Sequence, residues 1–171
     1  MFALNSFQRV YFVSKSEVAS WPFIGQLAKA TGTVFIERNP AKAAEQRELF
    51  TMRLQAGHKL LFFPEGTSTD GQQVLSFKPT LFAAYFDPEL RDRTFIQAVS
   101  LHYLAPEGKD ARFYCWWGDM SFAAHLITTL SVLKQGRVVI RFCDPVAVSD
   151  FKDRKALAAA LQASVAEAHT Q

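Results

Sequence analysis

A short apolar run that ends on a proline constrains this chain more than any other stretch. Leu60–Phe63 is apolar throughout, and Pro64, Glu65 and Gly66 follow at once. Such a run is typical of a short buried strand, and proline ends it because it has no N–H to donate to a neighbouring strand. Three hydroxyl residues and a second glycine complete a loop at residues 67–71. Because ligands of open α/β sheets bind outside strand ends of this kind, the pattern indicates a binding loop. A glycine-rich turn after a core strand explains it equally well.

Strands alternate with helices along the rest of the chain, which favours an α/β fold. We expect a mostly parallel layered sheet with flanking helices and one hairpin. The expected strands cover residues 9–14, 33–36, 60–63, 94–103, 112–117 and 137–143. The expected helices cover residues 23–30, 40–55, 79–86, 119–134 and a final stretch from Asp150 or Asp153. The turn signals at residues 105–110 predict that strands 94–103 and 112–117 form the hairpin.

The composition predicts one globular domain over residues 1–171. Hydrophobic residues make up 49% and charged residues 20% of the chain, which suffices for a core and argues against disorder. No run of 18 apolar residues predicts a membrane span, and the start lacks the pattern of a signal peptide. Cys115 and Cys143 stand alone in apolar stretches, so we expect core thiols in a reducing compartment. We expect neither a metal nor a cofactor.

The net charge of +3 suits an anionic partner, such as a phosphate or an acidic membrane surface. The lysines and arginines are spread along the chain, with neither a clustered basic stretch nor a run of stacking aromatics among them. A nucleic-acid partner is therefore not expected.

Two strand ends carry the candidate binding residues. Thr33–Ile36 ends on Glu37 and Arg38, and Leu60–Phe63 ends on the Glu65 loop. The ends of parallel strands share one edge of a sheet, so these groups are expected to meet there. A guanidinium beside exposed N–H groups and hydroxyls binds a phosphate well, and Lys78 adds a second cation. A surface ion pair at residues 37–38 and a solvated lysine at residue 78 remain the alternatives.

Several stretches of this sequence resemble one known family. Gly32–Arg38 matches a Gly-x-x-Phe-Ile-x-Arg pattern, and Phe63–Thr67 reads Phe-Pro-Glu-Gly-Thr. Both are similar to motifs of the glycerolipid acyltransferase family, which includes bacterial lysophosphatidic acid acyltransferases. Residues 12–17, 21–25 and 116–120 also resemble this family, so the likeness covers almost the whole chain in the right order.

The resemblance implies acyl transfer in phospholipid biosynthesis. The acceptor would be a lysophospholipid with a free hydroxyl, with lysophosphatidate expected first and lyso-ornithine lipid or another lyso-lipid as alternatives. The donor would be acyl-CoA or an acyl carrier protein, each a co-substrate. A histidine oriented by an aspartate takes the hydroxyl proton in this family, and N–H groups stabilise the oxyanion. By this resemblance Arg38 holds the acceptor phosphate. The predicted substrate-binding set is Gly32, Thr33, Arg38, Glu65, Gly66, Thr67 and Lys78.

The sequence departs from the family pattern at the catalytic general base. That histidine belongs to an H-x-x-x-x-D motif upstream of the segment matching residues 10–15, and these 171 residues contain no such motif. The positions five residues after the candidate histidines are Phe63 after His58, Glu107 after His102 and Leu130 after His125. No catalytic residue is therefore assigned within the chain. We expect the sequence to begin inside the domain, with the motif encoded upstream of Met1.

Two smaller departures concern the acceptor. Ser68 stands where the third motif often has arginine, so one cation is lost and the head-group preference stays open. Ala98 stands where the fourth motif usually has proline.

A lipid acceptor implies peripheral attachment at the cytoplasmic face of a membrane. The expected helix at residues 119–134 is apolar almost all round, and Trp116 and Trp117 precede it, so it is a candidate to lie in the interface. A buried core helix is the alternative. The second hypothesis for the whole chain is a catalytically inactive lipid-phosphate binding domain that retains the acceptor pocket, which predicts binding of lysophosphatidate without turnover.

Overall fold

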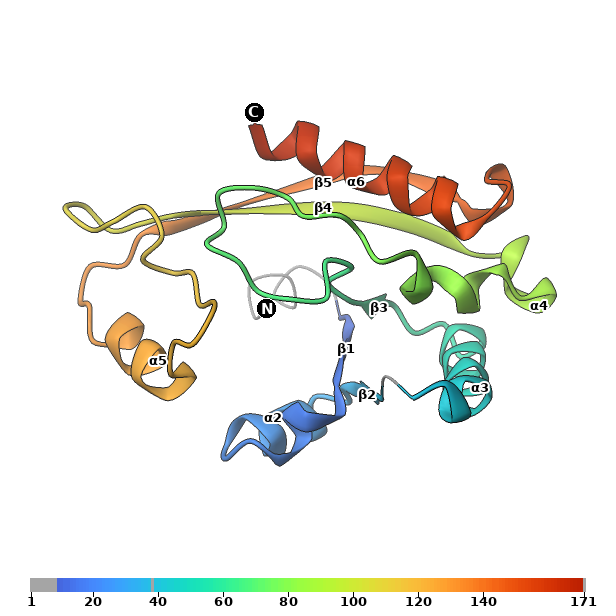
Figure 1. Cartoon of the computed structure of the whole chain (residues 1–171), viewed down its shortest axis with the longest axis horizontal. Helices are drawn as coiled ribbons and strands as arrows, with labels where there is room; N and C mark the ends of the chain where they lie inside the picture. Colours follow the sequence, from blue (N-terminus) through green and yellow to red (C-terminus); the bar gives the residue numbers. More distant parts are fainter. Residues whose placement is uncertain (1–8, 38, 171) are drawn as a thin grey trace. The chain divides into compact units, whose positions relative to one another are not determined.

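The computed structural model describes residues 9–37 and 39–170 (Figure 1). The chain divides into two compact units, one ending at Phe63 and the other beginning at Pro64. That residues 1–171 form a single acyltransferase-like domain stays a prediction.

A three-stranded parallel sheet forms the centre of the first unit, and it confirms the predicted parallel pairing. Its strand order is β2-β1-β3, with β1 (Tyr11–Lys15) between β2 (Val34–Ile36) and β3 (Leu60–Leu61). Val13 pairs with Val34 on one side of β1, and Tyr11 pairs with Leu60 on the other. The buried apolar residues here are Val10, Phe12, Val13 and Val34. The core of the unit therefore lies along its middle strand.

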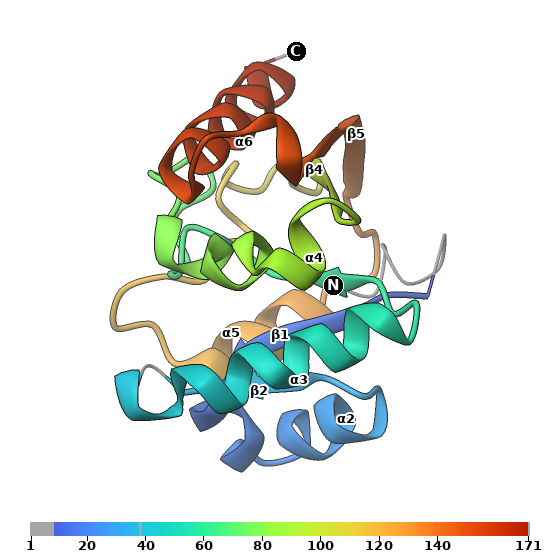
Figure 2. The ribbon, with the colours of Figure 1, turned by 90° about the vertical axis from the view of Figure 1, so that its right-hand side faces the viewer.

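Helical segments connect the parallel strands, as such pairs require. Between β1 and β2 the chain forms a 3-10 turn, η1 (Ser16–Ser20), and the helix α2 (Ile24–Ala30). Between β2 and β3 it forms η2 (Pro40–Lys42) and α3 (Ala43–Gln55), as predicted. Gly57 follows α3 with a φ of +76°, a left-handed conformation that glycine adopts without steric cost and that ends a helix. Figure 2 shows these helices from the side.

The second unit is built on an antiparallel pair, β4 (Phe95–Leu104) and β5 (Arg137–Ala147). The C-terminal helix α6 (Arg154–Thr170) packs along this pair (Figure 1). Leu157 and Leu161 of this helix are buried. Asp153 caps α6, because its Oδ1 accepts the N–H groups of Lys155 and Ala156, each at 2.9 Å. The remaining short helical segments are η3 (Pro79–Phe86), α4 (Pro88–Arg91) and η4 (Val148–Asp150).

The antiparallel pair has a different second strand from the one predicted. β4 pairs with β5, and residues 112–117 form no strand. The carboxylate of Asp110 accepts the Arg112 N–H at 2.8 Å and also binds the Arg112 guanidinium. Successive backbone bonds, from Phe113 to Asp110 and from Cys115 to Arg112, then coil the chain into turns. These local bonds use backbone N–H groups of this stretch that a strand would donate to β4.

β5 also runs past its predicted end, through a bulge. Gln97 pairs with Pro145, whereas Val99 pairs with Phe142, so β5 has one extra residue opposite β4 at this point. Pro145 has no N–H for the ladder, which a bulge tolerates. The Gln97 Nε2 group donates to the Cys143 carbonyl at 2.9 Å and so satisfies an acceptor in the irregular stretch. The strand therefore continues to Ala147 although proline signals a stop.

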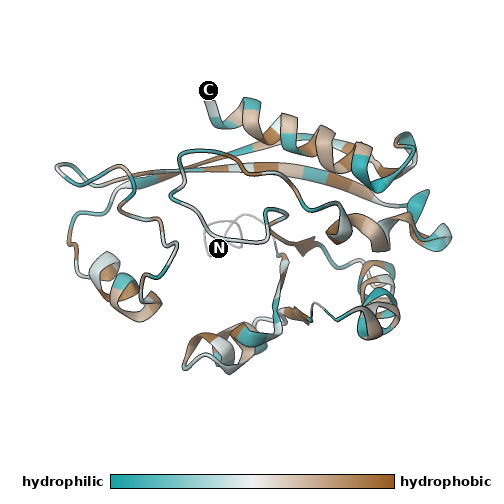
Figure 3. Ribbon diagram, viewed as in Figure 1, coloured by the Kyte–Doolittle hydropathy of each residue, from teal (hydrophilic) through white to brown (hydrophobic). Residues whose placement is uncertain are grey.

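The predicted helix at residues 119–134 is shorter than expected, since α5 covers only Phe122–Leu130. Before it, Gly118 has a φ of +60° and the Trp116 indole N–H donates to the Met120 carbonyl, which holds this stretch in a turn. No residue of α5 is buried, so the alternative of a buried core helix is wrong. Ile127 is 68% and Leu130 71% exposed, and Leu133, just beyond the helix, is fully exposed. Figure 3 shows the apolar positions on α5 in brown.

Two further properties bear on the predictions. In the part of the chain that the structure describes, no helix is long and apolar enough to cross a membrane. Cys115 and Cys143 are free thiols and both are partly exposed, so the prediction of buried core thiols is wrong. Burial nevertheless raises the pKa of each thiol.

Leu157→Ala should destabilise the protein by about 2–5 kcal/mol, because the side chain is fully buried and its removal leaves a cavity. Leu133→Ala removes the same atoms from a fully exposed site and should change stability by less than about 0.5 kcal/mol. Urea unfolding followed by circular dichroism measures both. Equal losses in the two variants would mean that Leu157 is not a core residue.

Candidate functional site

Gly32 and Thr33, two predicted substrate-binding residues, close helix α2 at the start of β2. Gly32 has a φ of +73°, and a Cβ at this position would lie 2.9 Å from the Tyr11 ring. The Gly32 N–H donates to the Lys29 carbonyl and the Thr33 N–H to the Ala28 carbonyl, both at 3.0 Å. These contacts give both residues a structural role, since only glycine fits this conformation and this space. Their role in substrate binding stays a prediction.

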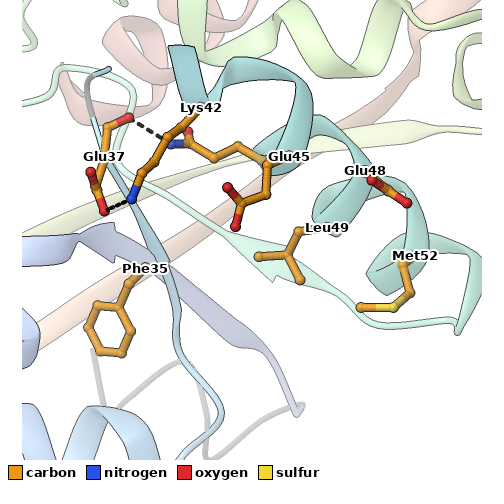
Figure 4. Close-up of a pocket in the computed structure, with 8 residues that line it drawn as sticks. Phe35, Glu37, Lys42, Glu45, Glu48, Leu49 and Met52 are labelled. Carbon is orange, nitrogen blue, oxygen red and sulfur yellow. Dashed lines mark hydrogen bonds and ion pairs between the residues drawn. The ribbon is translucent and has the colours of Figure 1, made fainter. Parts of the chain in front are cut away.

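The end of β2 carries an ion pair. The carboxylate of Glu37 lies 2.7 Å from Lys42 Nζ, and the Glu37 carbonyl accepts Gln46 Nε2–H at 2.8 Å (Figure 4). The hydrogen bond to Glu37 raises the pKa of Lys42. Both side chains are more than 40% exposed, so water screens the pair and it contributes little to stability. Arg38, the predicted phosphate-binding residue, lies outside the described residues.

A shallow pocket of about 330 Å³ lies between β2 and α3. Figure 4 shows its lining side chains, which come from the end of β2 on one side and from η2 and α3 on the other. The apolar surface comes from Phe35, Leu49 and Met52, and the carboxylates come from Glu37, Glu45 and Glu48. Among the lining residues that the structure describes, Lys42 is the one cation and stands against these three carboxylates. A ligand with an ammonium beside an apolar part would fit this lining.

Sequence reasoning missed this pocket, although a signal for it was present. Glu45, Glu48, Leu49 and Met52 recur at intervals of three and four, which places them on one side of a helix. The interpretation of residues 40–55 as a helix that simply covers the sheet gave these side chains no separate role.

Residues 64–78 form a loop whose ends meet. The Lys78 N–H donates to the Pro64 carbonyl at 2.8 Å, and within the loop the Leu75 N–H donates to Glu65 Oε2 at 3.1 Å. The tip is held by the Gly71 N–H, which donates to Thr69 Oγ1 at 3.1 Å. A compact loop of this length with closed ends is an Ω-loop, a form that often carries function. The structure thus brings Glu65, Gly66, Thr67 and Lys78 of the predicted set into one closed loop of the second unit.

The groups of this loop differ in exposure and charge. Glu65 is partly buried, and burial raises the pKa of its carboxyl group, while the Leu75 N–H and the nearby charge of His169 act in the opposite direction. Thr67, Ser68 and Lys78 are exposed. Gly66 has a φ of +71°, which explains a glycine between Glu65 and Thr67. The loop therefore presents hydroxyls and an ammonium to solvent, while the Glu65 carboxylate is partly buried.

The strand ends point the same way, as predicted, because β2 and β3 both run parallel to β1. They are nevertheless staggered. Leu61 pairs with Phe12, whereas Ile36 pairs with Lys15, so β2 extends three residues further along β1, or about 10 Å. Among residues 9–37 and 39–170, no group of three potential metal ligands is close enough to hold an ion.

Comparison with known proteins agrees with this architecture. Residues 1–101 match the family model described as Acyltransferase. The crystal structure of the 1-acyl-sn-glycerophosphate acyltransferase PlsC from Thermotoga maritima resembles the chain with a TM-score of 0.60 at 19% identity, over 95% of this chain and 56% of that one. At this level of identity the likeness shows the fold alone, and it confirms the predicted α/β fold.

Several curated proteins with similar sequences are named as acyltransferases of lipids. The lyso-ornithine lipid O-acyltransferase of Rhodobacter capsulatus is 59% identical over 165 residues, which is 96% of this chain and 60% of that protein. The enzyme of the same name from Brucella abortus is 35% identical over 93% of this chain and 62% of its own length. The 1-acyl-sn-glycerol-3-phosphate acyltransferase of Neisseria gonorrhoeae is 34% identical over 64% of this chain and 42% of its own length.

The chain thus spans about three fifths of the two lyso-ornithine lipid acyltransferases that it matches. The family model covers more than half of the chain, and it includes both the Gly32–Arg38 and the Phe63–Thr67 motifs. The chain belongs to the acyltransferase family.

Proposed function

We propose that this protein transfers a fatty acyl group from an acyl thioester to the free hydroxyl of a lysophospholipid, and that the acceptor is lyso-ornithine lipid. One observation carries the proposal: the 59% identity with a lyso-ornithine lipid O-acyltransferase extends over 96% of the chain. The likeness to a 1-acyl-sn-glycerol-3-phosphate acyltransferase is 34% over 64%. Lysophosphatidate, the first expectation from the motifs, becomes the second candidate.

The charges around the two motifs support this choice of acceptor. An ornithine head group carries an ammonium and a carboxylate, and it lacks the phosphate of lysophosphatidate. Ser68 supplies no cation where the family often has arginine, and it is exposed. Among its described lining residues, the pocket beside the end of β2 has three carboxylates and one lysine, and carboxylates attract an ammonium and repel a phosphate dianion. In this proposal Arg38 pairs with the carboxylate of the head group.

The reaction joins the acceptor hydroxyl to the acyl carbon. The hydroxyl oxygen attacks the thioester carbonyl while a base takes its proton, the oxyanion collapses, and the thiolate leaves and is protonated. The proposed base is the histidine of an H-x-x-x-x-D motif outside the 171 residues. Both acyl-CoA and acyl carrier protein fit as donors. The Glu65 loop is proposed to bind the acceptor through its exposed hydroxyls and Lys78.

An acceptor assay tests this function. The 171-residue chain and the longest in-frame product of its gene are each incubated with lyso-ornithine lipid or lysophosphatidate, with acyl-CoA or acyl carrier protein as donor, and products are quantified by mass spectrometry. For the longer product we expect kcat/KM to favour lyso-ornithine lipid by about ten-fold or more, the effect of one charged contact. Arg38→Ala should raise the KM for the acceptor by about ten-fold. Arg93→Ala, at an exposed arginine of the second unit, is the matched control.

Three results would count against the proposal. A preference for lysophosphatidate would overturn the choice of acceptor. Binding of either lipid by the longer product without turnover would instead support the inactive lipid-binding domain. An Arg38→Ala variant with an unchanged KM would remove that residue from the binding site.

We also propose that the protein works at a membrane surface through Ile127, Leu130 and Leu133, the apolar α5 surface. These side chains are 68–100% exposed. Trp116 and Trp117 lie just before α5, and Lys134 and Arg137 follow it with exposed charges, a combination that suits an anionic bilayer interface. A lipid acceptor would be reached at such a surface. Attachment would be peripheral, and the cytoplasmic face stays a prediction.

Leu130→Asp and Leu133→Asp should each weaken binding to vesicles of phosphatidylcholine and phosphatidylglycerol by about ten-fold, because each replaces a buried apolar contact by a charge. Leu27→Asp is the matched control, since Leu27 is 43% exposed on α2 and lies in the first unit. Co-sedimentation at several salt concentrations measures the binding. If all three variants bind like the wild type, the apolar α5 surface is not the membrane contact.

A further inference from the structure

A cationic and aromatic cluster surrounds Tyr11, the first residue of β1. The guanidinium carbon of Arg9 lies 5.5 Å and that of Arg53 lies 5.6 Å from the centre of the Tyr11 ring. The His58 ring packs against the same tyrosine, with ring centroids 4.4 Å apart and planes at 32°. We call these four residues the Tyr11 cluster. Figure 2 shows the end of α3, which carries Arg53, at the same edge of the first unit as the start of β1.

The end of helix α3 fixes two members of the cluster relative to each other. The His58 N–H donates to the Arg53 carbonyl and the Gly57 N–H to the Leu54 carbonyl, both at 3.0 Å. This is the Schellman motif, in which a left-handed glycine turns the chain back across the last turn of a helix. The turn brings Arg53 Nη1 to 3.4 Å from His58 Nδ1. The backbone therefore holds the arginine and the histidine together.

The Tyr11 ring is also fixed in place. The Tyr11 N–H donates to the Lys59 carbonyl at 2.8 Å, which places the tyrosine beside the residue that follows His58. On another side the ring lies next to Gly32, where a side chain would come within 2.9 Å of it. The ring is thus a rigid support for the cations around it.

Among the residues that the structure describes, neither arginine of the cluster is paired with a carboxylate. There Arg9 contacts the Tyr11 ring, and Arg53 contacts this ring and His58. Their guanidinium carbons are no more than about 11 Å apart, which is the sum of their two distances to the ring centre. Like charges at such a separation repel each other, and the uncharged ring cancels neither charge. A bound anion would remove this repulsion.

The dipole of α3 explains only one of the two cations. A basic residue in the last turn of a helix offsets the partial negative charge of the last carbonyls, and Arg53 occupies that turn. Arg9 precedes a strand, so no helix end accounts for its charge. Arg9 is exposed and Arg53 is partly exposed, so both are accessible to a ligand.

The Tyr11 cluster is separate from the end of β2. Tyr11 begins β1, whereas Ile36, the last residue of β2, pairs with Lys15 at the other end of β1. Four residue steps along a strand correspond to about 13 Å. The cluster and the pocket beside the end of β2 therefore lie toward opposite edges of the three-stranded sheet.

We propose that the Tyr11 cluster is a second anion-binding site, and that its ligand is a phosphate group. A guanidinium binds two oxygens of one phosphate through parallel N–H groups, and it is less strongly hydrated than an ammonium. Two sources of phosphate suit this protein: the nucleotide part of an acyl-CoA donor and the head groups of an anionic membrane. The first source rests on the proposed function, whereas the binding of phosphate itself does not.

Calorimetric titration of the longest in-frame gene product with pyrophosphate tests the site. Arg9→Ala and Arg53→Ala should each raise the Kd by about ten-fold or more, because each removes one charge-assisted pair of hydrogen bonds. Arg53→Lys keeps the charge without the paired N–H groups and should give an intermediate Kd. Arg47→Ala is the matched control, since Arg47 is an exposed arginine on a different face of the same helix. Its Kd should equal that of the wild type.

NMR determines where the pyrophosphate binds. The side-chain Nε–H signal of Arg53 and the ring signals of His58 should shift during the titration and saturate with the calorimetric Kd. The Arg47 side-chain signal should stay in place. Binding that leaves the Arg53 and His58 signals unshifted would place the anion elsewhere and overturn the proposal. So would the absence of both heat and shifts up to millimolar pyrophosphate. Circular dichroism of each variant excludes loss of fold as the cause of weaker binding.

Two further titrations distinguish the sources of phosphate. Free coenzyme A should lose about ten-fold in affinity in Arg9→Ala and Arg53→Ala if the donor is the source. Vesicles of phosphatidylcholine with phosphatidylglycerol should bind these variants more weakly than the wild type if the membrane is the source. Either result supports the site, and unchanged binding of both probes would overturn it as a site for either source.

The same measurements separate this proposal from the proposed function. A gene product that transfers no acyl group to any lyso-lipid would contradict the proposed function, while the pyrophosphate titration would still decide whether the Tyr11 cluster binds phosphate. An active enzyme whose Arg9→Ala and Arg53→Ala variants bind pyrophosphate like the wild type would overturn this inference and leave the function standing.

Discussion

The backbone pairing of β1 with both of its neighbours is the constraint on which the first unit depends. A parallel strand satisfies its N–H and C=O groups only through partners on either side, and β1 has β2 on one side and β3 on the other. The two crossovers are therefore obligatory, and α2 and α3 supply them. The same pairing fixes the direction of β2 and β3, so both strands run toward the same edge of the three-stranded sheet, with a stagger of three residues.

Most of the first unit could be predicted from sequence, because each of its elements is specified locally. The apolar strands, the helix formers of α3 and the glycine after it act within a few residues of their own position. The parallel direction followed from the alternation of strands and helices alone. The positions of Gly32 and Thr33 were predicted as binding positions, and the structure adds the reason why their conformation is needed: the Tyr11 ring and the end of α2.

The errors in the second unit have both local and non-local causes. Residues 112–117 were predicted to pair with β4, but β5 pairs with it instead. The carboxylate of Asp110 binds the backbone N–H and the guanidinium of Arg112, and these bonds hold the chain in turns. The composition of residues 119–134 left open whether the helix lies in a membrane interface or in the core, because composition cannot show whether another element packs on a helix. The hydrogen bond between Phe77 and Gln162 joins residues 85 positions apart, and no pattern in the sequence relates Gln162 to the loop after the Phe-Pro-Glu-Gly-Thr motif. The pocket between β2 and α3 could not be predicted, because its lining residues come from two elements whose relative position only the structure shows.

The bulge in β5 decides which face of the strand the side chains on either side of it occupy. Side chains of a strand alternate between two faces, so the extra residue opposite Ala98 exchanges the faces of the segments before and after it. Arg141 lies on the N-terminal side of that irregularity, and its guanidinium reaches the last turn of α6. A chain one residue shorter here would keep its hydrogen-bonded ladder yet turn Arg141 to the opposite side of the ribbon. The number of residues between Phe142 and Pro145 therefore matters more for the position of Arg141 than the identity of those residues.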